Sequence, residues 1–200
     1  MRGAIGALLL SAVLGAAPAA GGRVIAVAPM GDVPAEAVSR LVPVLRRTLA
    51  AEVVIGPALP LPASSYDAGR RQYRSTALLD ALARARRPGW DRLLGVADVD
   101  LFVPELNFVF GEADPDRGVA VFSLHRLRAE GAGPAGDELF ARRAATEAVH
   151  ELGHSYGLGH CRDPHCVMWF SNTLAESDRK GTSFCAAHAA ELQRLMGYLR

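Results

Sequence analysis

The segment 150–160 has the sequence HELGHSYGLGH, which contains three histidines at a spacing suited to one metal ion. His150 and His154 are four residues apart, so on a helix their Cβ atoms lie about 5 to 6 Å apart on one face. Gly157 can adopt the left-handed conformation that ends a helix, and the resulting turn brings His160 back as a third ligand. Three imidazoles leave the fourth position of a tetrahedral zinc ion open to water, as in catalytic zinc sites.

Glu151 lies next to the first of these histidines and is not itself a ligand in this arrangement. Zinc lowers the pKa of a bound water to about 7, and Glu151 can accept the proton while the oxygen attacks a carbonyl carbon. The full pattern HExxHxxGxxH arises by chance in such a chain with a probability of about 10⁻⁵, against about 10⁻² for HExxH alone. An amphipathic helix with ordinary histidines is therefore disfavoured. Gly153 is costly inside a helix, and we expect a small residue facing the metal there.

A second group of metal-binding residues follows directly. Cys161 and Cys166 form one close pair, and Cys185 and His188 form another, which is typical of a closed structural zinc site. Four protein ligands leave no position for water, so this ion would hold the fold together. The sequence thus predicts two zinc ions per chain, one catalytic and one structural. Two alternatives stay open: a disulfide between Cys161 and Cys166, and His165 in place of His188 as the fourth ligand.

The rest of the chain alternates strand and helix patterns, which predicts an α/β fold in one domain. Strands are expected at 23–28, 52–55, 92–96, 107–110 and 119–124, and helices at 35–51, 75–86 and 137–158. Pro43 argues against one uninterrupted first helix, and Ser75 is expected to cap the second. The segment 56–73, rich in Pro, Ala and Ser, is expected to be a loop. The sequence contains no internal repeat and no second domain boundary.

Residues 1–20 are predicted to be a signal peptide, because Arg2 precedes an apolar run that ends in small residues at 17–20. The protein would then be exported, either to the periplasm or out of the cell, and an uncleaved chain would instead be cytoplasmic. The apolar run is short for a membrane span, which needs about 20 residues, and no other segment approaches that length. After removal of the leader, no membrane span is expected.

Composition narrows the class of protein further. Hydrophobic residues make up 50% of the chain and charged residues 22%, which indicates a globular protein with a packed core. Lys and Arg number 22 and Asp and Glu 21, for a net charge of +1, so nucleic acid is not an expected partner. Three cysteines are too few for a disulfide scaffold.

The motif HExxHxxGxxH, followed by Cys161, by CVM at 166–168 and by a later pair of metal-binding residues, resembles the pattern of the archaemetzincins, a zinc peptidase family of the metzincin clan. The likeness extends through DAGRRQY at 67–73, DLF at 100–102, LNFVFG at 106–111 and SLHRL at 123–127, so it covers most of the chain after the leader. The resemblance implies a mixed sheet flanked by helices, with the active-site cleft beside an edge strand. The edge strand would come from 107–110 or 119–124.

The resemblance also assigns roles to individual residues. It implies zinc ligation by His150, His154 and His160, with Glu151 as general base. It places Met168 beneath the metal in a Met-turn, where it would also serve as a core methionine. The chain departs from the family pattern at position 188, where histidine replaces a cysteine, and the interval from 168 to 185 is one residue shorter.

The predicted function is a zinc-dependent peptidase, acting as a monomer on peptide or protein substrates. The alternative is a zinc-stabilised peptide-binding module with the same fold and no physiological proteolysis, and the intact Glu151 weighs against it. The sequence leaves open whether the enzyme is an aminopeptidase or an endopeptidase. Phe108, Phe110, Trp169 and Phe170 are either substrate-pocket residues or core residues.

Overall fold

A computed structural model describes residues 22–128 and 133–198, so the predicted leader at 1–20 lies outside the described residues. In chain order the elements are β1 (Val24–Met30), α1 (Ala35–Leu49), β2 (Glu52–Ile55), the 3₁₀ helix η1 (Ala63–Ser65), β3 (Tyr66–Asp67), β4 (Gln72–Arg74), α2 (Ser75–Ala85), β5 (Arg92–Ala97), β6 (Leu101–Phe102), β7 (Gly111–Asp114), β8 (Val119–Ser123), α3 (Pro134–Ser155), α4 (Leu174–Lys180) and α5 (Ala186–Leu195). None of the helices within these described ranges is long and apolar enough to cross a membrane.

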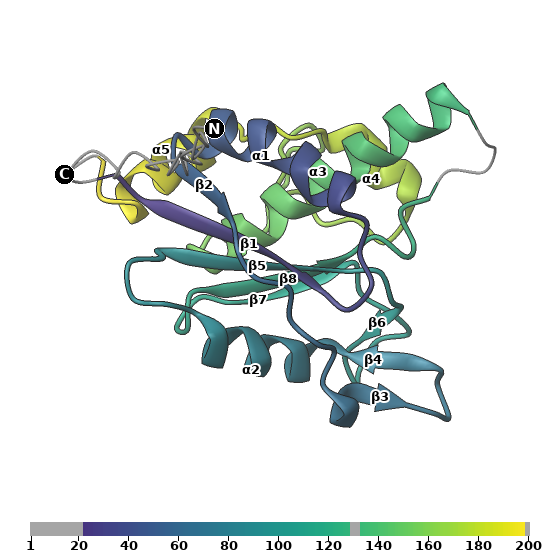
Figure 1. Cartoon of the computed structure of the whole chain (residues 1–200). Helices are drawn as coiled ribbons and strands as arrows, with labels where there is room; N and C mark the ends of the chain where they lie inside the picture. The colour runs from purple at the N-terminus through teal and green to yellow at the C-terminus, as the bar shows by residue number, and fades with distance from the viewer. Residues whose placement is uncertain (1–21, 129–132, 199–200) are drawn as a thin grey trace, which may run out of the picture.

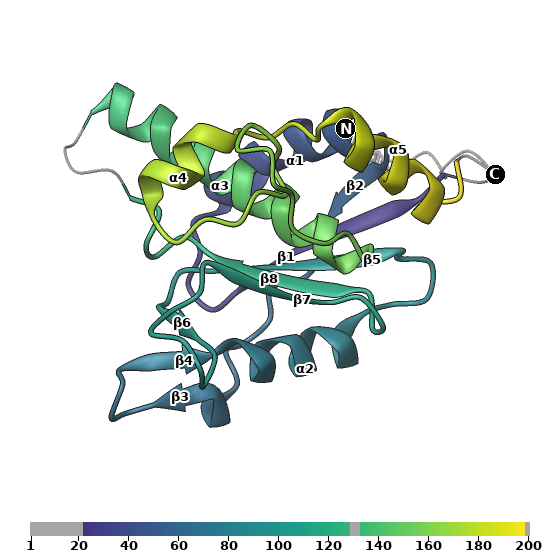
Figure 2. The same cartoon turned by 180° about the vertical axis from the view of Figure 1, so that it is seen from behind.

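A five-stranded sheet in the order β2-β1-β5-β8-β7 forms the centre of the molecule. Helices α1, α3, α4 and α5 lie on one face and α2 on the other (Figures 1 and 2). Strands β1, β2, β5 and β8 are parallel, and β7 pairs antiparallel with β8 at the edge. Strands covered on both faces are buried along their whole length, as all five residues of β8 are. The predicted α/β class with a mixed sheet and flanking helices is confirmed.

The two faces of the sheet carry two separate apolar clusters, because successive side chains of a strand point to opposite faces. Ile25 and Val27 of β1 join the cluster beneath α1 and α3. Ala26 and Ala28, from the same strand, join the cluster beneath α2. Helix α3 is therefore packed on one apolar face of the sheet.

Helix α1 is continuous through Pro43, so the expected interruption is wrong. Four residues, Val38, Leu41, Leu45 and Leu49, bury one face of the helix in the core. Pro43 lies on the exposed face, where water can satisfy the carbonyl group that loses its intrahelical partner. Packing of the buried face therefore outweighs the local cost of the proline.

The segment 107–110 is not a strand, contrary to expectation. Val109 makes only an isolated bridge to Leu101, and the strand starts where the pattern was expected to stop, at Gly111. The edge strand is thus β7 (Gly111–Asp114), and neither 107–110 nor 119–124 supplies it, because β8 lies between β5 and β7.

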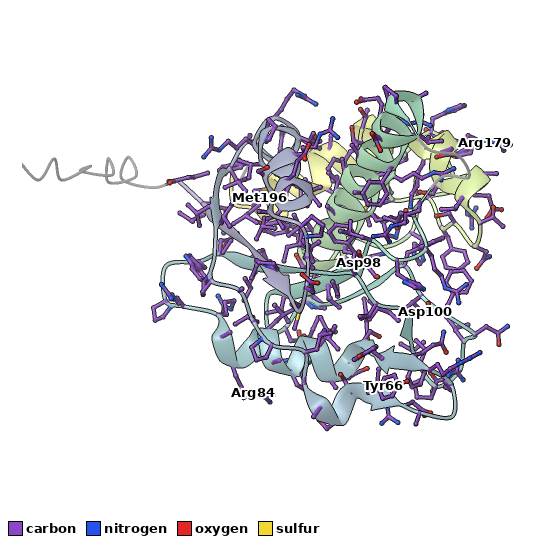
Figure 3. All side chains as sticks on the ribbon, turned by 45° about the vertical axis from the view of Figure 1, so that its right-hand side comes forward. Tyr66, Arg84, Asp98, Asp100, Arg179 and Met196 are labelled. Carbon is purple, nitrogen blue, oxygen red and sulfur yellow. The ribbon has the colours of Figure 1, made fainter. Side chains whose placement is uncertain are left out.

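The expected loop at 56–73 also contains regular structure. Strands β3 and β4 pair antiparallel there, and β4 pairs with β6 in a small second sheet. In Figure 3, the label Tyr66 marks this small sheet. The label Arg179 marks helix α4, which lies on the other side of the main sheet. Ser75 does not cap α2: its hydroxyl donates to Glu112 at 2.5 Å and also lies 3.1 Å from the Phe102 carbonyl.

Candidate active site

Helix α3 carries the first two histidines of the motif and ends three residues earlier than expected, at Ser155. Gly157 has φ +98°, the left-handed conformation expected of it. Its amide donates to the His154 carbonyl at 2.8 Å, and the Leu158 amide donates to the Gly153 carbonyl at 3.1 Å. This pair of bonds is the Schellman motif that ends many helices. The chain consequently turns back toward the helix, which brings His160 to the other two histidines.

The end of α3 is also fixed to the sheet from outside the site. Arg92 at the start of β5 donates to the Ser155 carbonyl at 2.9 Å, and its guanidinium lies 4.1 Å from the centroid of the Tyr156 ring. The Tyr156 hydroxyl donates to Asp91 at 2.6 Å. The orphan carbonyl groups at this helix terminus therefore have protein partners.

The three histidine rings converge, with one ligand atom from each lying within 4.8 Å of the others. His150 Nδ1 lies 2.7 Å from the Val167 carbonyl and His154 Nδ1 lies 2.8 Å from the Leu158 carbonyl. A carbonyl oxygen only accepts, so each Nδ1 carries the proton and each Nε2 has a free lone pair. The two Nε2 atoms are 3.1 Å apart. Two lone pairs facing each other at this distance fit a shared cation.

Burial keeps these histidines in the neutral form that binds metals. Loss of solvent lowers the pKa of His150 well below its ordinary value and lowers the pKa of His154 to about 4. Burial also lowers the pKa of His160, although this side chain is the most exposed of the three. The chemistry of the donor set therefore fits zinc.

Glu151 is buried in the protein and lines the same cleft as the three histidines. Burial raises its pKa well above the ordinary value, the neighbouring Glu147 carboxylate raises it further, and the charge of Lys180 opposes both effects. Glu147 accepts a hydrogen bond from Ser177 at 2.7 Å and pairs with Lys180 at 3.3 Å. Sequence reasoning missed this ion pair. Glu147 could have been found one helical turn before Glu151, but nothing in the sequence marks Lys180.

A cleft of about 660 Å³ runs between β7 and the histidines. Its walls include Phe108 and Phe110 on one side and Phe170 on the other. Phe170 is also exposed and lies edge-on to the His160 ring at 4.9 Å. Trp169 is not among the residues that line the cleft. Three of the four aromatic residues considered from the sequence therefore form the cleft walls.

The second group of predicted metal ligands also comes together. Cys161, Cys166, Cys185 and His188 each place one ligand atom within 4.8 Å of the others. The Cys161 and Cys185 sulfurs are 3.9 Å apart, and Cys185 Sγ lies 3.3 Å from His188 Nδ1. Hydrogen bonds from the His188 backbone and side chain lower the pKa of Cys185 to about 7, whereas burial raises the pKa of Cys166 to about 11.

The structure does not bring the alternative ligands together. His165 is exposed and lies outside the cluster, and its backbone amide donates to Asp163 at 2.9 Å. All three cysteines are free, so the disulfide between Cys161 and Cys166 is not formed.

Met168 lies beneath the helix that carries the histidines and is fully buried. Its carbonyl accepts the Cys161 amide at 2.8 Å. A Cβ atom on Gly153 would lie 2.4 Å from Met168 Sδ and 3.5 Å from the Phe184 ring. The small residue expected at 153 therefore faces Met168, and the expectation that it faces the metal is wrong.

Comparisons with known proteins agree with this geometry. Residues 51–194 match the model of peptidase family M54. The chain is 41% identical over 180 residues to an archaemetzincin of Pyrococcus furiosus, covering 86% of this chain and 94% of that protein. It is 46% identical over 134 residues to an archaemetzincin of Methanopyrus kandleri, covering 67% and 73%.

Solved structures show the same fold. The crystal structure of archaemetzincin from Methanopyrus kandleri superimposes with a TM-score of 0.79 at 38% identity, covering 90% of this chain and 98% of that one. Archaemetzincin from Archaeoglobus fulgidus, crystallised in complex with malonate, gives a TM-score of 0.72 at 39% identity, covering 84% and 99%. The chain therefore belongs to peptidase family M54, the archaemetzincins, and is a zinc metallopeptidase that hydrolyses peptide bonds.

Proposed function

We propose that His150, His154 and His160 hold the catalytic zinc and that Glu151 is the general base. The observation that carries this proposal is the meeting of two unprotonated Nε2 atoms, 3.1 Å apart, in a cleft that Glu151 also lines. Zinc held there supplies Lewis acidity for the scissile carbonyl and makes water a better nucleophile.

Glu151 moves the protons of the reaction. Its carboxylate accepts a proton from the attacking water while the water oxygen bonds to the carbonyl carbon. The same carboxyl group then gives the proton to the departing amine nitrogen as the C–N bond breaks. One molecule of water is thereby added across one peptide bond, and Glu151 returns to its starting state.

The substrate lies along β7 in this proposal. Among the described residues β7 pairs only with β8, so its other edge can pair with an extended peptide. The aromatic walls of the cleft favour peptides with apolar side chains near the cleaved bond. The alternative of a binding module without proteolysis has no use for a buried carboxylate beside the histidines.

A second zinc bound by Cys161, Cys166, Cys185 and His188 completes the proposal, giving two ions per chain. Four protein ligands close this site, so its role is structural. The backbone of Cys185 donates to the Cys166 sulfur at 3.3 Å, and the amide of Asp163 donates to the Cys161 sulfur at 3.4 Å. Such bonds stabilise thiolates, which are the form that binds metals.

The experiment that tests catalysis uses zinc-loaded protein and a peptide library containing both free and blocked N-termini. We expect the protein to cleave peptides and a chelator to stop this cleavage. Cleavage of peptides with free N-termini but not of peptides with blocked N-termini would identify an aminopeptidase. Glu151→Gln should keep its zinc while the rate falls by roughly 10² to 10⁴-fold. Glu138→Gln is the matched control, because Glu138 lies on the same helix with its side chain 80% exposed. Parental activity in Glu151→Gln would refute the assigned base.

Export is a separate proposal that rests on the sequence of 1–20 alone. Mass spectrometry of protein exported by a bacterial host should find an N-terminus near residue 20 or 21. An intact Met1 on cytosolic protein would overturn it and leave the catalytic assignment untouched.

A further inference from the structure

Gly111, the first residue of the edge strand β7, stands directly against the Glu151 side chain. A Cβ atom built on Gly111 would lie 2.5 Å from Glu151 Cγ, 2.6 Å from Cδ and 2.6 Å from Oε1. These are the three nearest heavy atoms, and all belong to Glu151. Even one methyl group at position 111 would therefore occupy the space of the carboxylate.

The backbone does not need glycine at this position. Gly111 is absent from the residues with left-handed φ, so an alanine there would meet no backbone strain. The strand is in register with β8, where Gly111 faces Phe122, and the Ser123 amide donates to the Phe110 carbonyl at 2.9 Å. Close approach to Glu151 is the reason that remains.

If a side chain were added, Glu151 would be the group that moves. Strand β7 is held by its pairing with β8, and α3 is held on the sheet by its buried residues. The Glu151 side chain, in contrast, borders an open cleft of about 660 Å³ into which it can rotate. A methyl group on Gly111 would therefore displace the carboxylate without unfolding the protein.

We propose that Gly111 is a positioning residue for the reaction: its missing side chain lets the Glu151 carboxylate lie against β7, at a fixed distance from a peptide bound along that strand. The inference rests on the proposed role of Glu151. The contact between Gly111 and Glu151 links the substrate-aligning strand to the general base, because β7 then determines the position of the Glu151 carboxylate.

The test compares Gly111→Ala with Gly56→Ala. Gly56 follows β2 at the opposite edge of the same sheet, has no left-handed φ, and a Cβ there meets its nearest atom at an ordinary 3.4 Å. Gly111→Ala should keep its zinc and its KM within about twofold, while kcat falls by roughly 10²-fold, a loss that a 1 Å misplacement can cause. Gly56→Ala should match the parent protein. Unchanged kcat in Gly111→Ala would overturn the proposal.

Two readouts do not depend on activity. A crystal structure of Gly111→Ala should show the Glu151 carboxylate displaced by about 1 Å or more, and an unmoved carboxylate would overturn the proposal. Any loss of melting temperature in Gly111→Ala should disappear in a Glu151→Ala background, because the three contacting atoms are then absent. A loss that persists there would show that the strand itself needs glycine. If the parent protein cleaves no peptide, the proposed function fails, and the crystal structure still decides the role of Gly111.

Discussion

At Gly153, as at Gly111, another side chain occupies the space that a Cβ atom would need. Gly153 lies inside α3, where glycine costs about 1 kcal/mol relative to alanine. The Met168 sulfur occupies the space that a side chain would need, at 2.4 Å from the Cβ position. The Met168 side chain is fully buried and cannot move away easily. At the residue scale, close packing beneath the active-site helix therefore outweighs helix propensity.

Gly153→Ala should lower the free energy of unfolding by about 1 to 2 kcal/mol, because overpacking costs about 1 to 3 kcal/mol and the gain in helix propensity offsets part of it. Urea unfolding measures the change. In a Met168→Ala background the same substitution should become neutral or stabilising, since the sulfur is gone. An equal loss in both backgrounds would contradict the packing explanation.

Helix α4 has only seven residues and is too short to be stable alone. A capping box of Thr173 and Glu176 begins it. Arg143 of α3 donates to both oxygens of Asp178, at 2.8 and 2.7 Å. The buried pair of Lys180 and Glu147 makes a second connection between the two helices. Because α4 directly follows the cleft wall at 170–172, these contacts hold one side of the cleft in place.

Lys180→Met should destabilise the protein by about 3 to 5 kcal/mol, because it leaves the Glu147 carboxylate buried without a cation. The double variant Glu147→Gln, Lys180→Met should recover much of that loss. Arg142→Met serves as the control, since this half-exposed residue pairs with Asp178 at 3.5 Å and such pairs contribute about 1 kcal/mol at most. Urea unfolding of all three variants checks the prediction, and a double variant no more stable than Lys180→Met would contradict it.

The pair of Arg143 and Asp178 should make stability depend on acid. The hydrogen bonds from Arg143 hold the pKa of Asp178 below its ordinary value of 3.8. A carboxyl group with a lowered pKa in the folded state stabilises the protein fully above pH 3.8, and the contribution is lost as the pH falls through the folded pKa. Asp178→Asn should therefore be less stable than the parent at pH 6, with a difference that shrinks toward pH 2. A difference independent of pH would contradict this assignment.

At the scale of the whole molecule, the two predicted zinc sites share no ligand but are joined by one peptide bond, between His160 and Cys161. The first set lines the cleft and the second joins the chain after α3 to the start of α5. Helices α4 and α5 cover the same face of the sheet as α3 (Figure 2). We expect zinc bound at the cysteine cluster to hold the C-terminal third over α3.

Metal analysis of purified protein with reduced thiols should find two zinc ions per chain. His154→Ala should retain one ion and a stable fold, whereas Cys185→Ala should lose an ion and also melt at lower temperature, because binding energy at a closed site is folding energy. The cysteine site should also resist chelator longer than the open site. A single tightly held zinc in the parent protein would refute the model of two sites.

Much of this fold could be predicted from the sequence where a pattern is local. Strand β2 has the expected bounds, and β1, β5 and β8 lie within two residues of expectation, because buried parallel strands are short apolar runs. Gly157 has the expected conformation because a left-handed helix end favours glycine in any context. The helix pattern and the histidine spacing together were enough to predict that His150, His154 and His160 come together.

Features that depend on tertiary contacts could not be read in this way. The contact at Gly111, the first residue of β7, is with Glu151, a residue 40 positions later in the sequence. Pro43 is tolerated because the buried face of its helix packs in the core, and this packing cannot be predicted from the local sequence. The pairing of Lys180 with Glu147 joins two helices whose packing is known only from the fold.

The contacts of Arg92, Tyr156 and Asp91 at the C-terminus of α3 should make local unfolding of this helix end slow. To separate His154 from His160, the chain must break the Schellman bonds and the contacts that hold Ser155 and Tyr156 to β5. Opening there must break all of these contacts together, so the Leu158 amide should exchange its hydrogen with solvent more slowly than amides of exposed loops. We then expect the three rings to keep their arrangement between successive catalytic turnovers, so that the site does not have to be reassembled for each substrate.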